Sequence, residues 1–231
     1  MEARKNFHDQ LGVIHDDLVR LAALVVEALS NGTEAMLAGD VAAGQALIDA
    51  DDTLDLMALD IEERCYQLLA LQQPMAGDLR QLVTAIRLAS EFERSGDLVT
   101  NIMKGAQRLT GAPSEPRLRG LLQQMSDLAA TLMRRSIEAY ADGDAAKARG
   151  LDVDDDVLDD RHRDYIAHVL ESCRNGDIEI QAAVQLALVG RYYERIGDHA
   201  VNVGERVLYM VSGWMPEHHH RARPDTGEPV A

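Results

Sequence analysis

The sequence predicts an all-α protein built as a tandem repeat of two three-helix bundles. Hydrophobic residues make up 46% of the 231 residues but aromatic residues only 4%, so the apolar mass is leucine, alanine, valine and methionine. These residues suit helix-on-helix packing better than a β-sandwich. Apolar positions recur every three or four residues over long segments, and no alternating strand pattern of useful length appears. The same plan occurs twice along the chain.

The first predicted bundle covers residues 1–111. Its first helix carries periodic apolar residues between positions 11 and 29 and ends at Gly39-Asp40. The second helix, periodic between positions 47 and 68, ends before Gln73-Pro74, because proline resists continuation of a helix. The third helix has its apolar residues between positions 79 and 109.

Asn31-Gly32 is a strong turn signal inside the first predicted helix. The corresponding dipeptide of the second half, Arg135-Ser136, carries no such signal. We therefore expect the first helix to continue through this point.

A linker over residues 112–116 is expected, because Gly111-Ala-Pro-Ser-Glu-Pro116 interrupts the helical pattern. The second bundle then covers residues 117–213, with helices over about 117–141, 145–174 and 178–212. Residues 214–231 contain three prolines and no apolar period, so we expect this tail to be disordered.

Matching motifs support the duplication. Glu93-Arg-Ser-Gly-Asp97 recurs 101 residues later as Glu194-Arg-Ile-Gly-Asp198. Asp51-Asp-Thr-Leu-Asp55 recurs 104 residues later as Asp155-Asp-Val-Leu-Asp159. The longer Gln-Gln-Pro-Met-Ala-Gly connection of the first half absorbs the difference between the two offsets. A duplicated three-helix unit is the simplest explanation.

Composition excludes several functional classes. The chain has 23 Lys and Arg against 39 Asp and Glu, a formal net charge of −16, which argues against nucleic-acid binding and against electrostatic membrane binding. The start lacks the apolar segment of a signal peptide, and the longest apolar run, residues 21–26, is too short to span a bilayer. We expect a cytoplasmic protein in which Cys65 and Cys173 are free thiols.

Four pairs of carboxylates stand four residues apart: Asp51/Asp55, Glu93/Asp97, Asp155/Asp159 and Glu194/Asp198. Such neighbours lie side by side on a helix, where like charges cost about 0.2–0.5 kcal/mol per pair. Two of the pairs continue the apolar stripe of their helix, and an asparagine follows one turn later: Glu93, Asp97 and Asn101 in the first half, Glu194, Asp198 and Asn202 in the second. No Lys or Arg lies on that stripe close to them in sequence, so a bound cation is the simplest way to neutralise them.

Taken alone, the other two pairs, Asp51/Asp55 and Asp155/Asp159, are better explained as acidic helix faces exposed to solvent. They lie at the edge of an apolar stripe, however, and can face the inward pairs to complete an all-oxygen site. Oxygen donors suit Mg, Mn or ferric iron rather than Zn or Cu.

Gly96 and Gly197 repeat at one place in both motifs, although glycine inside a helix costs about 1 kcal/mol. They indicate the close approach of a neighbouring backbone or ion, and close helix packing without an ion explains them equally well. Arg94 and Arg195 fall off the stripe and are expected at the surface.

The two Glu-Arg-x-Gly-Asp motifs with their following asparagines, Asn101 and Asn202, resemble the PhoU family of bacterial phosphate-specific transport. The connection from Gln73 to Arg80 and the closing segment from Tyr209 to Gly213 are also similar to that family. The resemblance covers residues 8–213. Two departures are Ser95, where the family has an apolar residue, and Leu98, where the second half has a histidine.

The resemblance implies a tandem of three-helix bundles that binds metal ions (Fe, Mn or Mg) through its acid-x-x-x-acid motifs. Asp51/Asp55 and Asp155/Asp159 match the first carboxylate pair of each bundle. The resemblance further implies a cytoplasmic, dimeric negative regulator without enzymatic activity. When phosphate is plentiful, such a protein links the ATPase of the phosphate ABC transporter to a sensor histidine kinase.

Two other classes stay open. One is a carboxylate-bridged metalloenzyme in a helical bundle, and the other is a purely structural helical dimer without metal or partner. The helices lack the Glu-x-x-His element of di-iron bundles, whose one match, Glu217 to His220, lies in the tail. We also expect no inward histidine ligand, and we find no glycine-rich phosphate loop, nucleophile elbow or Cys-x-x-Cys pair.

Overall fold

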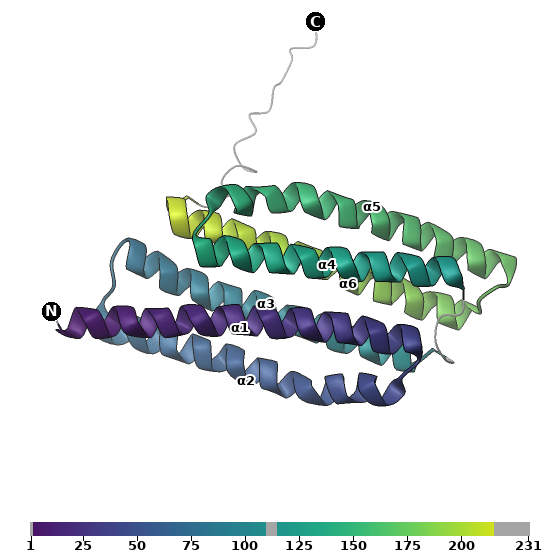
Figure 1. Cartoon of the computed structure of the whole chain (residues 1–231), viewed down its shortest axis with the longest axis horizontal. Coiled ribbons are helices and arrows are strands. Elements are labelled where there is room, and N and C mark those ends of the chain that lie inside the picture. The colour runs from purple at the N-terminus through teal and green to yellow at the C-terminus, as the bar shows by residue number, and fades with distance from the viewer. Residues whose placement is uncertain (1, 110–114, 215–231) are drawn as a thin grey trace, which may run out of the picture.

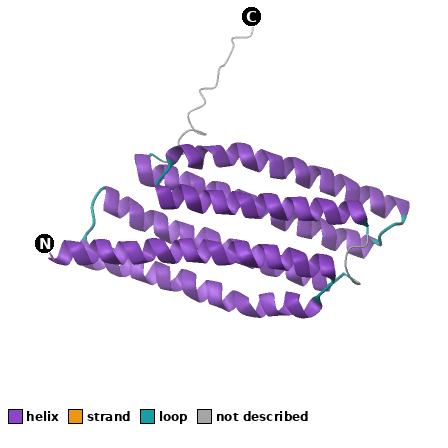
Figure 2. Cartoon of the chain, viewed as in Figure 1, coloured by secondary structure: helices purple, strands orange, loops and turns teal. Residues whose placement is uncertain are grey.

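The computed structural model describes residues 2–109 and 115–214, and in these ranges it contains six α-helices and no strand (Figures 1 and 2). They are α1 (Glu2–Ala38), α2 (Val41–Gln72), α3 (Gly77–Gln107), α4 (Pro116–Asp142), α5 (Ala145–Asn175) and α6 (Ile180–Ser212). The all-α class and the repeat of three helices are confirmed. No described helix combines the length and the apolar character needed to cross a membrane.

The helices end where the sequence carries turn signals. Four glycines with positive φ follow the ends of α1, α4, α5 and α6: Gly39 (69°), Gly143 (60°), Gly176 (81°) and Gly213 (76°). Glycine adopts this conformation without the steric cost of a Cβ atom. The following residue caps the next helix in two cases, since Asp40 accepts a hydrogen bond from Ala43 N at 2.9 Å and Asp144 accepts one from Ala146 N at 2.8 Å.

Helix α1 continues through Asn31-Gly32, as predicted. Gly32 is buried there, and a Cβ atom on it would lie 3.1 Å from Met103 Cε, so the glycine serves packing rather than a turn. Helix α4 begins at Pro116, the last residue of the predicted linker. Residues 110–114 and the tail from residue 215 onward lie outside the described residues, so the predicted disorder of the tail stays a prediction.

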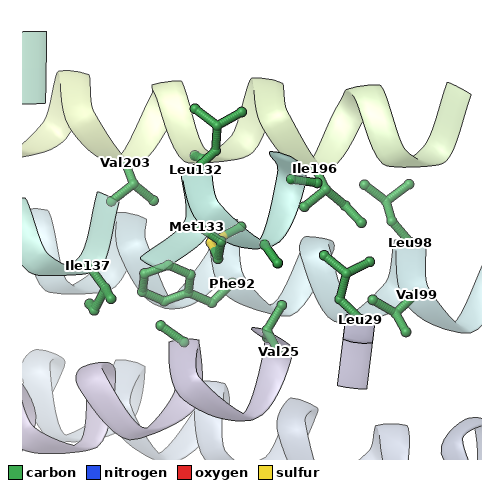
Figure 3. Packing of buried hydrophobic residues seen from close by; sticks show 14 of the residues in the cluster. Val25, Leu29, Phe92, Leu98, Val99, Leu132, Met133, Ile137, Ile196 and Val203 are labelled. Carbon is green, nitrogen blue, oxygen red and sulfur yellow. The ribbon is translucent and has the colours of Figure 1, made fainter. Parts of the chain in front are cut away.

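The two bundles pack into one body with a shared interior. Helices α1, α3, α6 and α4 contact one another in a ring, while α2 packs on α1 and α3 and α5 packs on α4 and α6 (Figure 1). One apolar cluster takes residues from all six helices. Figure 3 shows its centre, where Leu29 of α1, Phe92 of α3, Met133 of α4 and Ile196 of α6 meet.

A buried hydroxyl cluster joins the two repeats inside this ring. Thr33 Oγ1 on α1 lies 2.8 Å from Ser126 Oγ on α4 and 2.7 Å from the Tyr193 hydroxyl on α6. A buried hydroxyl without a partner costs about 1–3 kcal/mol, so sliding any of the three helices would be unfavourable. The cluster therefore fixes the register of α1, α4 and α6.

Helices α5 and α6 approach so closely that a side chain larger than glycine would not fit between them. A Cβ atom on Gly204 would lie 2.9 Å from the backbone oxygen of Ala148 and 2.7 Å from Leu151 Cδ1. Because one of these atoms belongs to the backbone, a side-chain rotation alone cannot relieve the overlap.

We therefore expect Gly204→Ala to lower the free energy of unfolding by about 1–3 kcal/mol, since α5 must shift to admit the methyl group. Gly120→Ala is the matched control, because Gly120 is an exposed helical glycine with nothing within 4 Å of its Cβ position. It should raise the same quantity by about 0.5–1 kcal/mol. Chemical denaturation measures both, and a stabilising effect of Gly204→Ala would contradict the close approach of α5 and α6.

Candidate functional site

The predicted carboxylates gather at two equivalent places, each in the groove between an outer helix and the third helix of its repeat. The first acidic site is formed by Asp51 and Asp55 of α2 with Glu93 and Asp97 of α3. The second acidic site comprises Asp155 and Asp159 of α5, which interact with Asp198 of α6, and Glu194, one helical turn before Asp198. In both repeats the outer-helix pair thus lies near the aspartate of the inner-helix motif, and joint metal binding by the two pairs stays a prediction.

Charge crowding is the dominant property of the first acidic site. Burial raises the pKa of Asp51, Asp55 and Glu93, and the nearby carboxylate of Asp97 raises all three further. Thr100 opposes this at Asp51 by a hydrogen bond that lowers its pKa. Among the described residues, no Lys, Arg or His forms an ion pair with any of the four carboxylates of this site.

The second acidic site is crowded in the same way. Burial raises the pKa of Asp155 to about 7, and the carboxylates of Asp159 and Asp198 add to the shift. Burial and Asp159 also raise the pKa of Asp198, while Arg191 opposes them.

Arg191 corrects one expectation from the sequence. Its Nη1 forms an ion pair with Glu194 Oε1, and its Nη2 lies 3.9 Å from Asp198 Oδ2. A basic residue does therefore lie close to these carboxylates in sequence. It was missed because it precedes Glu194 by three positions, whereas the stripe was followed in steps of four.

The burial of the motif carboxylates is also uneven. Glu194 is 8% exposed and Glu93 is half-buried, but Asp97 and Asp198 are exposed, so the prediction that they lie on the inward stripe is wrong for the two aspartates. Steps of four residues advance the direction of a side chain by about 40° around the helix, since each residue turns about 100°. The stripe therefore rotates from the interior to the mouth of the groove.

The glycines of the motifs allow the outer helices to reach the acidic sites. A Cβ atom on Gly96 would lie 3.0 Å from Leu54 Cδ1 and 3.6 Å from Asp51 Oδ1. A Cβ atom on Gly197 would collide with Asp155 Oδ1 and lie 2.7 Å from Leu158 Cδ2. Each glycine thus allows two things at once: the outer helix packs closely on the inner helix, and an aspartate of the outer helix reaches the motif.

Three carboxylate oxygens at these sites are buried and have no hydrogen-bond partner in the described part of the chain: Asp55 Oδ1, Asp155 Oδ1 and Glu194 Oε2. Such atoms are costly unless a proton or a cation satisfies them. At the first acidic site a cavity of about 280 Å³ adjoins Asp55 and Glu93. The donor set of each site therefore fits a cation bound by oxygen.

The sites are not preformed cages. Within residues 2–109 and 115–214, no three His, Cys, Asp or Glu side chains converge closely enough to hold a metal ion. Of the two asparagines, Asn101 is half-buried, and Asn202 donates a hydrogen bond from Nδ2 to Glu91 Oε2 at 3.2 Å. Asn202 is thus engaged across the junction of α3 and α6.

A buried histidine that the sequence did not single out lies at the junction of the two repeats, where it pairs with a carboxylate and not with the acidic sites. His199 is 6% exposed, and its Nδ1 lies 2.6 Å from Oε2 of the equally buried Glu91. Burial raises the pKa of Glu91, but hydrogen bonds from His199 and Asn202 outweigh burial and hold that pKa below its ordinary value. A second inward histidine, His162, lies beside the second acidic site, and burial lowers its pKa.

Comparison with known protein families finds the same domain in each of the two repeats. The PhoU domain is matched twice, over residues 18–106 and 122–207. The chain is 35% identical over 211 residues to the phosphate-specific transport system accessory protein PhoU homolog of Aquifex aeolicus, covering 89% of this chain and 92% of that protein. It is 31% identical over 214 residues to PhoU homolog 2 of Mycobacterium tuberculosis, covering 92% of this chain and 100% of the relative.

Solved structures share the fold. The crystal structure of PhoU from Pseudomonas aeruginosa superposes with a TM-score of 0.84 at 25% sequence identity, covering 90% of this chain and 100% of the other. The phosphate transport system regulatory protein PhoU from Streptococcus pneumoniae superposes with a TM-score of 0.83 at 24% identity, covering 90% and 98%.

The raised pKa of Asp155 predicts how the metal-free protein responds to pH. Between the ordinary value of 3.8 and about 7, folded Asp155 holds a proton that the unfolded chain has released. Its contribution to stability is therefore present below about pH 4 and is lost as the pH rises through 7. Asp155→Asn should flatten this dependence and stabilise the protein at about pH 8 by about 1–2 kcal/mol, a value reduced for partial exposure.

Denaturant unfolding in chelator at about pH 5 and about pH 8 measures the effect. Glu34→Gln, at an exposed position of α1, should leave the pH dependence unchanged. Equal pH dependence in wild type and Asp155→Asn would show that Asp155 is not the crowded group.

Proposed function

The chain belongs to the PhoU family, and on that premise we propose that it is the accessory and regulatory protein of a phosphate-specific transport system. The observation that carries this proposal is the extent of the similarity. The PhoU domain matches both repeats, and the alignment with the Aquifex aeolicus relative covers 92% of that protein. The likeness thus extends over both acidic sites and the junction between the repeats.

In the proposed role the protein is a cytoplasmic, dimeric adaptor rather than an enzyme. It links the ATPase of the phosphate ABC transporter to a sensor histidine kinase and holds the starvation response off when phosphate is plentiful. Support comes from α2, which exposes Leu56 (67%), Leu59 (59%) and Tyr66 (53%). Large apolar side chains exposed on one helix are typical of a surface that a partner protein covers.

The proposed signal-bearing elements are the two acidic sites, each holding Mn, Mg or Fe. Asp51, Asp55, Glu93 and Asp97 would hold the ion of the first site, and Asp155, Asp159, Glu194 and Asp198 that of the second. The three unpartnered buried oxygens carry this proposal. When bound, the metal supplies positive charge that neutralises the crowded carboxylates. The carboxylates themselves come from two helices at each site, so binding joins α2 to α3 and α5 to α6.

Asp97→Asn combined with Asp198→Asn tests the metal sites. In chelator the double variant should be at least as stable as wild type, because each change removes a charge that its neighbours repel. In saturating Mn the wild type should gain stability by RT ln(1 + [L]/Kd), and the variant should not. Thermal melts of both proteins with chelator and with Mn measure the two effects, which have opposite signs.

The matched control is Asp52→Asn with Asp156→Asn, two exposed aspartates next to the proposed ligands Asp51 and Asp155 on the outer helices. It should keep the gain in Mn. A less stable Asp97→Asn/Asp198→Asn protein in chelator would mean that these aspartates make structural hydrogen bonds. An equal gain in Mn for that variant and wild type would remove them as ligands.

Deletion of the gene tests the regulatory role. In phosphate-rich medium the deletion should switch on the phosphate-starvation genes, because the proposed adaptor holds the kinase output off. Transcript levels of these genes measure the effect, and restoring the wild-type chain should silence them again. Unchanged expression in the deletion strain would refute the assignment as a phosphate regulator.

A further inference from the structure

The two acidic sites differ at one position that the repeat makes comparable. By the offset of 101 between the Glu-Arg-x-Gly-Asp motifs, Arg191 of α6 is the sequence equivalent of Ser90 of α3. Arg191 is half-exposed, with 50% of its side chain accessible, while the side chain of its partner Glu194 is only 11% accessible. A flexible cation thus reaches from the solvent to a buried carboxylate.

The contacts of Arg191 are those of a cation bound by the site. Its guanidinium pairs with Glu194 through Nη1, and Nη2 lies 3.9 Å from Asp198 Oδ2. An ordinary surface pair on one helix involves two exposed side chains and contributes little. Glu194 is buried, and its other oxygen has no hydrogen-bond partner in the described ranges, so this pair neutralises a desolvated charge.

Within residues 2–109 and 115–214, no basic side chain takes such a position at the first acidic site. Ser90 lines the cavity of about 280 Å³ together with Asp55 and Glu93. Two basic residues, Arg94 and Lys104, lower the pKa of Glu93 and Asp51 respectively, but both are exposed. Among the described residues neither forms an ion pair with the four carboxylates of this site, so the charge of the site is balanced only from a distance.

We propose that Arg191 occupies the cation position of the second acidic site, so that a divalent metal ion fills the first acidic site first and enters the second only by displacing the Arg191 guanidinium. The inference rests on the proposed function, since both sites must bind metal. Arg191 then sets the order and the relative affinity of metal binding in the two repeats.

Electrostatics favours the displacement. Arg191 pairs with Glu194 Oε1 while Oε2 is unpartnered, so a divalent ion entering at Oε2 would lie close to the guanidinium and be repelled by it where water is partly excluded. The half-exposed side chain of Arg191 can turn into the solvent, where a guanidinium is well hydrated. Metal entry therefore costs the ion pair of Arg191 with Glu194, a cost that the first acidic site does not have.

Exchange of the two equivalent residues tests the inference directly. Mn²⁺ is titrated into the full chain by calorimetry, and electron paramagnetic resonance counts the free Mn²⁺. Wild type should show two classes of site whose Kd values differ by about tenfold, the cost expected for breaking one charge-assisted pair. Arg191→Ser should tighten the weaker class by about tenfold and merge the two, and Ser90→Arg should weaken the stronger class by a similar factor.

Further variants assign the classes to the repeats. Asp97→Asn should remove the strong class, and Asp198→Asn should remove the weak one. Arg191→Lys keeps the charge and should keep the separation between the classes. Melts in chelator confirm that each variant is folded, and Ser90→Arg, which adds a long side chain beside an open cavity, provides a test independent of Arg191→Ser.

Several results would overturn the inference. Equal affinities at the two sites of wild type, or an Arg191→Ser protein whose weaker class changes by less than about twofold, would show that Arg191 does not compete with the metal. Weaker binding in Arg191→Ser would show that Arg191 holds the ligands in place. A wild type without any Mn²⁺ binding would remove the proposed metal sites themselves, whereas two bound ions with unaffected exchange variants would remove only the role of Arg191.

Discussion

The packing of α3 against α6 is the contact on which the rest of the structure depends. Each is the third helix of its repeat, and each buries one face against its own bundle and another against its counterpart. Without that second face the repeats would be two separate bundles with small cores, and small cores stabilise a fold poorly. The junction instead produces one apolar cluster across all six helices. Glu91 and His199 lie within it, paired at 2.6 Å, where each neutralises a polar group that burial would otherwise make costly.

This double use of α3 and α6 decides where the acidic sites can be. Apolar contacts cover two sides of each helix. Charged residues can therefore lie only on the remaining sides, which face the outer helices α2 and α5. Gly96 and Gly197 then let Leu54 and Leu158 pack closely, which brings the aspartates of the outer helices onto the motif carboxylates. The outer helices are therefore held partly by apolar packing and partly against charge repulsion, and any cation at the groove changes that balance.

Periodicity and internal repetition predicted the helices, the duplication and the facing carboxylate pairs. These features depend on residues close together in sequence, or they occur in both repeats. The inward Glu91 and His199 were not predicted, since a three-helix bundle buries one face of each helix and the second buried face of α3 arises only from the partner repeat. A signal was available: Glu91 lies on the stripe of Leu88, Ser95 and Leu98, all of them buried. The repeats also differ at some equivalent positions, such as Ser90 and Arg191, where the charge beside the acidic site changes. A comparison that looks only for matching motifs overlooks these positions.

A duplicated chain could also join like repeats from two molecules, with α3 packing on a second α3 in place of α6. The pairing of Glu91 with His199 disfavours this arrangement. In the repeat numbering His199 corresponds to Leu98 and Asn202 to Asn101, so an α3–α3 junction would place Glu91 opposite leucine and keep only the equivalent of the Asn202 hydrogen bond. A hydrogen bond to a charged group contributes about 1.5–3 kcal/mol, so losing the one from His199 disfavours the wrong partner even where the apolar surfaces match. The departure of Leu98 from its counterpart in the second half thus adds to the specificity of the junction, beside the hydroxyl cluster of Thr33, Ser126 and Tyr193, which the repeat does not duplicate either.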